Sequence, residues 1–380
     1  MSQSTFAHRV SQIEISGIRR LFELSANMKN PIDLSLGQAD FDVPEAVKQK
    51  LYEAVAAGKN RYTPSAGIPE FRNAAMERLK QEGISTNSVM AIAGASAGLN
   101  LAMLVLADEN TDVYIADPYF VAYPQIIKLA NSNRVTIDTY PDFRLTPERI
   151  RARVDERAKE LGAKAEGRKR VLIYNSPANP TGTTYSETEI KALVKCTQDL
   201  KFTVISDEVY DSFCLDQPHL SWLKYDPSAV LVRAFSKTGG MPGWRIGFAA
   251  APLPILTEMI KMQQFTYVCV NAPAQWAVLP LFNHSYSSLL EDYRMRRDFV
   301  MKELVPAYQV QKSGGSFYLF VKYPEKMSGD EFIKRCMAKE LLVVPGSTFS
   351  ARDTHFRLSF SASIETLKKG IAILNEIASH

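Results

Sequence analysis

Short apolar runs alternate along the chain with longer stretches in which apolar residues recur every three or four positions. The short runs predict buried strands, because they are rich in Val, Ile and Phe: "VMAIAG", "DVYIAD", "RVLIYNS", "FTVISDE", "AVLVRAFS" and "RIGFAA". The longer stretches predict amphipathic helices, among them "PEAVKQKLYEAVAAG" and "SETEIKALVKCTQDL", the second opened by a capping box of Ser186 and Glu189. This alternation predicts an α/β fold in which helices sandwich a mostly parallel sheet.

The pattern changes near the C-terminus, where "GSFYLFVKY", "LLVVPGSTF" and "HFRLSFS" read as strands with short helical stretches between them. We interpret this region as a second, smaller α/β domain. The predicted division is an N-terminal segment over 1–45 that joins the small domain, a large domain over 46–280, and the small domain over 281–380.

Composition and charge exclude several classes of protein. Of 380 residues, 46% are hydrophobic and 23% charged, as in ordinary globular proteins, and a net charge of +4 gives no support for a nucleic-acid partner. No apolar stretch is long enough to cross a membrane, and the first residues lack the apolar core of a signal peptide. The four cysteines form no CxxC pair and show no metal-ligand spacing, which favours a cytoplasmic protein without a metal site.

Polar residues end four of the predicted strands, at Asp117, Asn175–Ser176, Asp207 and Ser236–Lys237. Since the carboxyl ends of parallel strands share one edge of a sheet, we expect these groups to line one crevice. Asp207 follows an apolar run and should be poorly solvated, so it needs a cationic partner. Lys237, Arg245 or a ligand could supply that charge, and a purely structural ion pair is the alternative.

Two turns beside these strand ends carry further signals. "GASAGLN", from Gly94 to Asn100, places small residues between a strand and the apolar helix "LNLAMLVLA". Such a run exposes backbone N–H groups that can bind an anion, although it matches neither the dinucleotide fingerprint nor the P-loop. "NPTG", from Asn179 to Gly182, is a rigid turn that holds the Asn179 amide in one direction.

The motifs together, in their order, resemble one family. "YTPSAGIPEFR", "GASAG", "DPYFVAYP", "NSPANPTG", "SDEVY", "SKTGGMPGWRIG" and "FRLSFS" are similar to motifs of the class I/II aminotransferases, pyridoxal 5'-phosphate (PLP) enzymes of fold type I. The resemblance covers nearly the whole chain. It implies a large PLP-binding domain with a seven-stranded type of sheet, a smaller α/β domain, and ping-pong transfer of an amino group between an L-amino acid and a 2-oxo acid.

The resemblance assigns roles to individual residues around the cofactor. Lys237 matches the catalytic lysine that forms a Schiff base with PLP, and Arg245 the arginine that binds the phosphate. Asp207 matches the carboxylate partner of the pyridine nitrogen. The other cofactor contacts implied are Tyr210 and Asn179 at the phenolic oxygen, Phe120 on the ring face, and Ala95, Ser96 and Ser236 at the phosphate.

Substrate and partner roles follow in the same way. Arg357 matches the arginine that binds the substrate carboxylate, with the Gly37 backbone opposite and Asn179 beside it. Tyr62 matches a tyrosine that reaches the phosphate of the neighbouring subunit, which implies a homodimer with shared active sites. Gln38, Phe22 and Arg352 are candidates for contacts with the substrate side chain, whose chemical class the sequence leaves open.

Two alternatives are compatible with parts of this pattern. A PLP-dependent C–S lyase shares the fold, because elimination begins from the same bound substrate. A transcription regulator with an aminotransferase-like domain would need a DNA-binding domain before it, whereas the family match begins within about forty residues of Met1, too few for such a domain. A catalytically inactive binding module is disfavoured because Lys237, Asp207 and Arg245 are all present.

Overall fold

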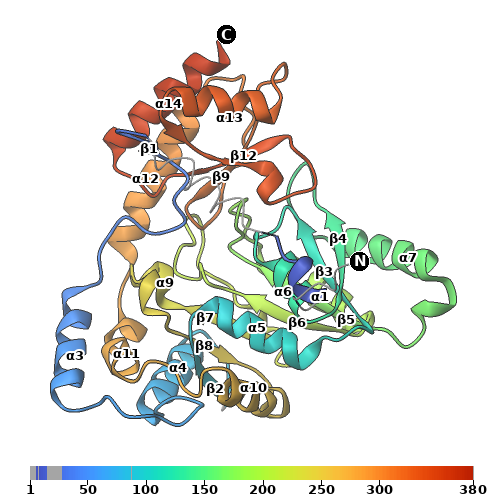
Figure 1. Cartoon of the computed structure of the whole chain (residues 1–380), viewed down its shortest axis with the longest axis vertical. Helices are drawn as coiled ribbons and strands as arrows, with labels where there is room; N and C mark the ends of the chain where they lie inside the picture. Colours follow the sequence, from blue (N-terminus) through green and yellow to red (C-terminus); the bar gives the residue numbers. More distant parts are fainter. Residues whose placement is uncertain (1–5, 7, 15–27, 87, 380) are drawn as a thin grey trace.

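The computed structural model describes residues 6, 8–14, 28–86 and 88–379. Its centre is a seven-stranded sheet in the order β2-β8-β7-β6-β5-β3-β4 (Figure 1). All neighbours are parallel except β8, which runs antiparallel to β2 and β7. The predicted fold class is therefore confirmed. The bounds are β2 Val89–Ile92, β3 Thr111–Asp117, β4 Asn133–Asp138, β5 Lys169–Asn175, β6 Phe202–Asp207, β7 Val230–Ala234 and β8 Gly247–Ala250.

Helices bury both faces of this sheet, because alternate residues of the central strands point to opposite sides. Leu172, Val204 and Leu231 belong to a core that includes residues of α4 (Pro69–Gln81), α7 (Pro147–Leu161) and α8 (Glu187–Asp199). Their neighbours Ile173, Ile205 and Val232 belong to the opposite core, with α5 (Ala95–Leu106), α6 (Tyr123–Leu129) and α10 (Leu253–Thr266). The apolar runs of the sequence are thus strands covered on two sides.

A second layer of strands and helices, at the top of Figure 1, is built mainly from the C-terminal residues. The antiparallel strands β9 (Tyr318–Lys322), β12 (His355–Ser359) and β11 (Val344–Pro345) form a small sheet that shares a core with α12 (Ser287–Glu303), α13 (Gly329–Ala338) and α14 (Ile364–Ala378). Near the N-terminus, β1 (Ile32–Asp33) pairs in parallel with β10 (Leu341–Leu342). Domain boundaries at residues 45 and 280 stay a prediction.

Local sequence signals explain several helix ends. The Ser186 hydroxyl accepts from the Glu189 amide and the Glu189 carboxylate accepts from the Ser186 amide, so the predicted capping box is present. Such a cap is worth about 1 kcal/mol. One expectation was wrong: α5 begins at Ala95, so most of the small-residue run lies inside its first turn.

The remaining elements are short, apart from α3 (Glu45–Ala56), which corresponds to the predicted helix after Pro44. They are α1 His8–Ser11, α9 Phe235–Thr238, α11 Ala272–Ala277, η1 Gly162–Ala165, η2 Trp222–Lys224, η3 Pro242–Trp244, η4 Leu279–Asn283 and η5 Gly346–Thr348. Strand β4 was not predicted, because its alternating edge sequence contains only two buried apolar residues, Val135 and Ile137. In the part of the chain that the structure covers, no helix combines the length and apolarity that a bilayer crossing requires.

Candidate active site

A cavity of about 270 Å³ lies at the carboxyl ends of the parallel strands, where β5 ends at Asn175 and β6 at Asp207. Residues of β9 and β12 also line it, so the small C-terminal sheet forms one wall. The cavity brings together eleven of the residues predicted from the sequence: Gly37, Ala95, Ser96, Phe120, Asn179, Asp207, Tyr210, Ser236, Lys237, Arg245 and Arg357. The predicted convergence of polar strand ends is confirmed for Asn175, Asp207, Ser236 and Lys237, whereas Asp117 and Ser176 do not line this cavity.

Lys237 lies in the four-residue helix α9, which begins directly after β7. Its ammonium donates to the Gly37 carbonyl oxygen, from a segment far away in the sequence. Burial lowers the pKa of Lys237, and the positive charges of Arg357 and Arg245 lower it further, whereas Asp207 opposes the shift; the result is about 8. On the order of one tenth of this amine is therefore uncharged at pH 7, far more than for an ordinary lysine.

Asp207 is buried at the end of β6, and neutral groups hold its carboxylate. Oδ2 accepts from the Tyr123 hydroxyl at 2.7 Å, and Oδ1 accepts from the Val209 amide at 3.3 Å. Burial raises the pKa of Asp207 to about 6, although these bonds and Lys237 act in the opposite direction. The expected cationic partner is not found: within the described ranges, no basic side chain forms an ion pair with Asp207. A cationic group of a bound ligand could therefore serve as the counter-ion of Asp207.

The N-terminus of α5 and Arg245 form a cationic corner of the cavity. Gly94 precedes the helix with a φ of 79°, and a Cβ there would lie 2.6 Å from an Arg245 guanidinium nitrogen. Arg245 donates to the carbonyl oxygens of Pro242 at 2.9 Å and Ala93 at 3.3 Å, and forms no ion pair with any described carboxylate. Backbone N–H groups at a helix start together with an unpaired guanidinium favour an anion such as phosphate.

Arg357 is a second guanidinium without a carboxylate partner. It is 1% exposed on β12, which rules out a surface role, and donates to Asn179 Oδ1 at 3.1 Å and to the Ser35 carbonyl at 2.8 Å. Its Nε has no hydrogen-bond partner. The guanidinium carbon lies over the rings of Tyr318 and Phe349, at 4.2 and 4.8 Å from their centroids. A buried cation of this kind favours an anionic ligand, because burying an unpaired charge is costly.

Three polar residues of the cavity lining were not predicted as site residues. Tyr123 holds Asp207, the Tyr318 hydroxyl lies 3.0 Å from the Tyr210 hydroxyl, and Asn175 Oδ1 accepts from the Asn179 amide at 2.9 Å. Tyr123 lies in the motif "DPYFVAYP" and Tyr318 in the predicted strand "GSFYLFVKY", but neither was given a role. Apolar periodicity does not separate a hydroxyl that faces a cavity from one that packs in a core. Asn175 was noticed as a strand end but received no role.

The predicted residues outside the cavity are also informative. Tyr62 is 87% exposed and does not line the cavity of its own chain. Arg352 does not line it either, because it pairs with Asp138 and lies over the Tyr140 ring. Gln38 does not line the cavity; its backbone carbonyl oxygen accepts a hydrogen bond from the Ser361 hydroxyl. Phe22 lies outside the described residues.

Comparisons with known proteins agree with the geometry. Residues 29–374 match the family described as aminotransferase class I and II. The chain is 30% identical to a probable aspartate aminotransferase of Methanocaldococcus jannaschii over 97% of this chain and 98% of the relative. It is 31% identical to an aspartate/prephenate aminotransferase of Thermus thermophilus, over 93% and 92% of the two chains.

A solved structure is similar as well. A single mutant of Thermus thermophilus aspartate aminotransferase superposes with a TM-score of 0.90 and 29% identity, over 99% of this chain and 100% of that chain. These relatives are named as aminotransferases, and their names give no support to the lyase alternative. The chain therefore belongs to the class I and II aminotransferase family, and it is an enzyme that transfers amino groups.

Proposed function

We propose that this enzyme uses PLP to exchange an amino group between an L-amino acid and a 2-oxo acid in two half-reactions. One observation carries the proposal. The cavity combines a buried amine of lowered pKa, Lys237, with a carboxylate that lacks a counter-ion, Asp207, and with two guanidinium groups that lack carboxylate partners, Arg245 and Arg357.

The groups present fit PLP at each of its polar ends. The N-terminus of α5, Ser96, Ser236 and Arg245 fit a phosphate, since they offer N–H and O–H donors and a positive charge. Asp207 fits a protonated ring nitrogen, and Tyr210 and Asn179 can hydrogen-bond the phenolic oxygen. When bound, PLP supplies an electron sink for the electrons of the substrate Cα–H bond.

The side chains of the protein then bind, orient and move protons. Lys237 Nζ, uncharged in part near neutral pH, can attack a carbonyl carbon and can carry a proton to and from the substrate. Asp207 can keep a ring nitrogen protonated, and the added cation would draw the pKa of Asp207 down again. Arg357, with Asn179 beside it, can bind the α-carboxylate that every amino-acid substrate has.

We further propose a homodimer in which each site takes one group from the partner. Tyr62 is exposed in a single chain, and Tyr52 and Val55 of α3 add apolar exposed surface. Arg245, at the cationic corner, is exposed too, so a second chain could close the site there. We also place the enzyme in the cytoplasm, because its four cysteines are free thiols, which a reducing compartment maintains.

The decisive experiment is spectroscopic. Purified protein mixed with PLP should absorb as a Lys-bound cofactor, and borohydride should fix the cofactor to Lys237 in a peptide map. An amino donor alone should convert the spectrum, and a 2-oxo acid should restore it. Lys237→Ala should keep PLP without a covalent bond and lose this exchange. Uptake of no PLP would overturn the proposal, and release of ammonia and pyruvate instead of exchange would favour the lyase.

Hybrid dimers test the shared site. Lys237→Ala and Tyr62→Ala damage different halves of each site if Tyr62 serves the partner. Co-expression should then give hybrids with one native site, more active than either parent homodimer and up to half as active as the wild type. Hybrids with only half the activity of the Tyr62→Ala homodimer would instead place Tyr62 in the site of its own chain.

A further inference from the structure

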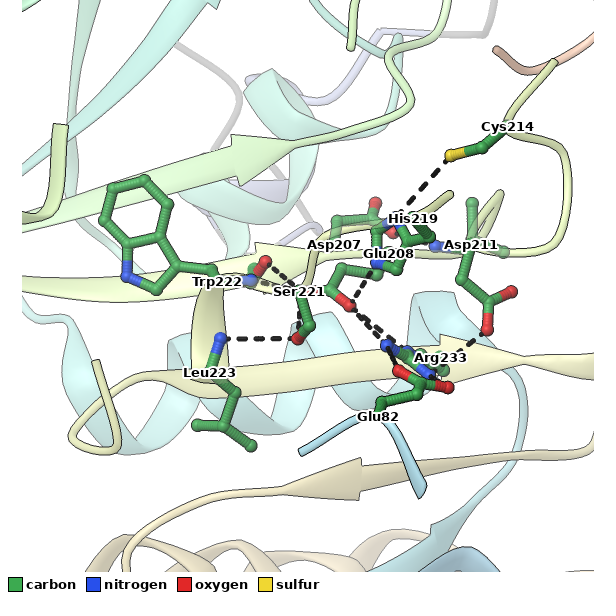
Figure 2. A network of polar contacts seen from close by, with 12 residues as sticks. Glu82, Asp207, Glu208, Asp211, Cys214, His219, Ser221, Trp222, Leu223 and Arg233 are labelled. Atoms are coloured by element: carbon green, nitrogen blue, oxygen red, sulfur yellow. Dashed lines mark hydrogen bonds and ion pairs between the residues drawn. The ribbon is translucent and has the colours of Figure 1, made fainter. Parts of the chain in front are cut away.

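A buried ionic cluster lies on the opposite face of the sheet from Asp207, and the proposed function does not use it. Figure 2 shows the cluster around the ends of β6 and β7. At its centre, Arg233 is 3% and Glu208 0% exposed, so the pair is fully removed from water. We call it the Glu208 cluster; its charged members are Arg78, Glu82, Glu208, Asp211, His219 and Arg233.

Glu208 has more hydrogen-bond donors around it than a carboxylate needs. Oε2 accepts from Arg233 Nε and Nη2 at 3.1 and 2.9 Å, and it lies 2.8 Å from His219 Nε2. Oε1 accepts from the hydroxyls of Ser206 and Ser221 and from the Trp222 amide, at 2.8 to 3.0 Å. The carboxylate is thereby fixed in position as well as neutralised.

Arg233 extends the cluster to a distant segment. Its Nη1 and Nη2 donate to the two carboxylate oxygens of Glu82 at 2.9 and 2.7 Å, and Nη1 lies 3.3 Å from Asp211. Three cations then balance three anions, provided that His219 is protonated. Burial opposes the charge of His219, but Glu208 outweighs burial and raises the pKa of His219 to about 10. The cluster is neutral as a whole.

Stability alone does not account for such a cluster, because well-packed apolar residues are often at least as stable as a buried ion pair. Its position suggests another role. Glu208 directly follows Asp207, and Arg233 lies on the strand that leads into Lys237. Asp207 is in register with Val232, and the Glu208 amide donates to the Val232 carbonyl at 2.9 Å. The ion pair between Glu208 and Arg233 therefore joins β6 and β7 close to Asp207 and Lys237 in the sequence.

We propose that the Glu208–Arg233 pair is a positioning device that holds the ends of β6 and β7 together and so sets the separation of Asp207 and Lys237. The inference rests on the proposed function for its catalytic meaning. Asp207 and Lys237 both lie where their strands end. Asp207 is the last residue of β6, and Lys237 follows the last residue of β7, Ala234, by three positions. The hydrogen bond from the Glu208 amide to the Val232 carbonyl lies at the end of the backbone pairing between the two strands, and the Glu208–Arg233 ion pair adds a side-chain tie at that end, where the reaction requires a fixed geometry.

The test uses Arg233→Met, which keeps the volume of the stem and removes the bridge, and Glu82→Gln, which removes only the outer charge. Arg233→Met should lower kcat by about 10- to 100-fold, as expected for a misplaced catalytic group, and should raise the Kd for PLP. Glu82→Gln should also lower kcat and raise the Kd for PLP, but by smaller factors. Arg233→Lys should recover part of the loss.

A second measurement does not depend on bound cofactor. In apoprotein, the pH dependence of Lys237 labelling by trinitrobenzenesulfonate reports its pKa, which is about 8 in the wild type. In Arg233→Met and Glu82→Gln the midpoint should rise toward the ordinary lysine value of 10.5, as the amine gains water. Arg297→Met is the matched control: Arg297 is also fully buried and binds both oxygens of Asp216 at 2.9 Å, but it lines no part of the cavity.

The outcomes separate the two proposals. A wild-type labelling midpoint in Arg233→Met overturns the positioning role. If Arg233→Met does not fold, a wild-type midpoint in Glu208→Gln, which removes the charge of the other member of the pair, overturns it. An equal shift in Arg297→Met at matched loss of stability also overturns it, since general loosening would then be the cause. If wild-type protein takes up no PLP, the proposed function fails, whereas the labelling midpoints still decide whether the pair positions Lys237.

Discussion

Two consecutive carboxylates at the end of β6 have opposite surroundings. Asp207 and Glu208 are 2% and 0% exposed and point to opposite faces of one sheet. Asp207 has a tyrosine hydroxyl and one backbone amide, and burial raises its pKa to about 6. Glu208 has Arg233 and His219; they outweigh burial and lower its pKa to about 2. Two equally buried carboxylates thus have pKa values shifted in opposite directions, because only Glu208 has cationic ion-pair partners among the described residues.

The buried arginines show the same contrast. Arg233 is bound to three carboxylates, whereas Arg357, equally buried, has two neutral oxygens and a free Nε. Arg233 is already neutralised by carboxylates of the protein, so it is not available to bind an anionic ligand. Asp207, Arg245 and Arg357, which form no ion pair among the described residues, lie around one cavity, and their uncompensated charge is available to substrate and cofactor.

The largest effect should come from Asp207→Asn, which keeps the shape of the side chain and removes the charge. We expect kcat/KM to fall by about 10³-fold, the size found when a preorganised electrostatic group is removed. Steady-state kinetics with saturating PLP measures it. Activity within a few-fold of wild type would mean that catalysis does not require the charge of Asp207. The different surroundings of Asp207 and Glu208 would then have no bearing on function.

Arg357→Ala should lower kcat/KM by about 10²-fold or more for every amino donor alike, because it removes a charged bond to a group that all donors share. Apoprotein stability should change little, since no buried carboxylate loses its partner. Kinetics with acidic, aromatic and aliphatic donors, together with thermal unfolding, tests both points. If a single class of donor suffers, Arg357 contacts the substrate side chain instead.

Asp207 should also destabilise the apoprotein at neutral pH. Its pKa is raised from 3.8 to about 6, so ionisation costs the folded state about 3 kcal/mol above pH 6, and this cost disappears as the pH falls toward 4. Asp207→Asn should therefore unfold at a higher temperature than wild type at pH 7 and at the same temperature near pH 4. A pH-independent difference would show that burial does not shift this carboxyl group.

The smallest effect concerns His219 on the other face. Its raised pKa means that its charge stabilises the fold fully below pH 6.5 and progressively less as the pH rises through about 10. His219→Gln should cost about 2 kcal/mol of unfolding free energy at pH 6, the price of one hydrogen bond to a charged group, and much less at pH 10. Denaturant titrations of the two proteins at both pH values measure the difference, and a constant difference would mean that His219 is uncharged.

Much of the site was predictable because its residues occur in short local motifs. Lys237 and Arg245 share one segment, Asp207 and Tyr210 another, and the strand ends place these segments at one edge. Local patterns also predicted six of the seven strands of the large sheet. They missed β4, where an edge position leaves half of the residues polar, and they placed the start of α5 too late, because small residues have no apolar periodicity.

The sequence by itself determined which elements form, which polar groups end the strands and which family the motifs match. Only the tertiary structure decided which charges meet. Glu82, Glu208, His219 and Arg233 come from separate segments, so no local pattern could pair them, whereas Asp207 and Arg357 are distinguished by partners they do not have among the described residues. Charge pairing depends on distances of a few ångströms in a medium of low dielectric constant, and the folded chain alone sets those distances.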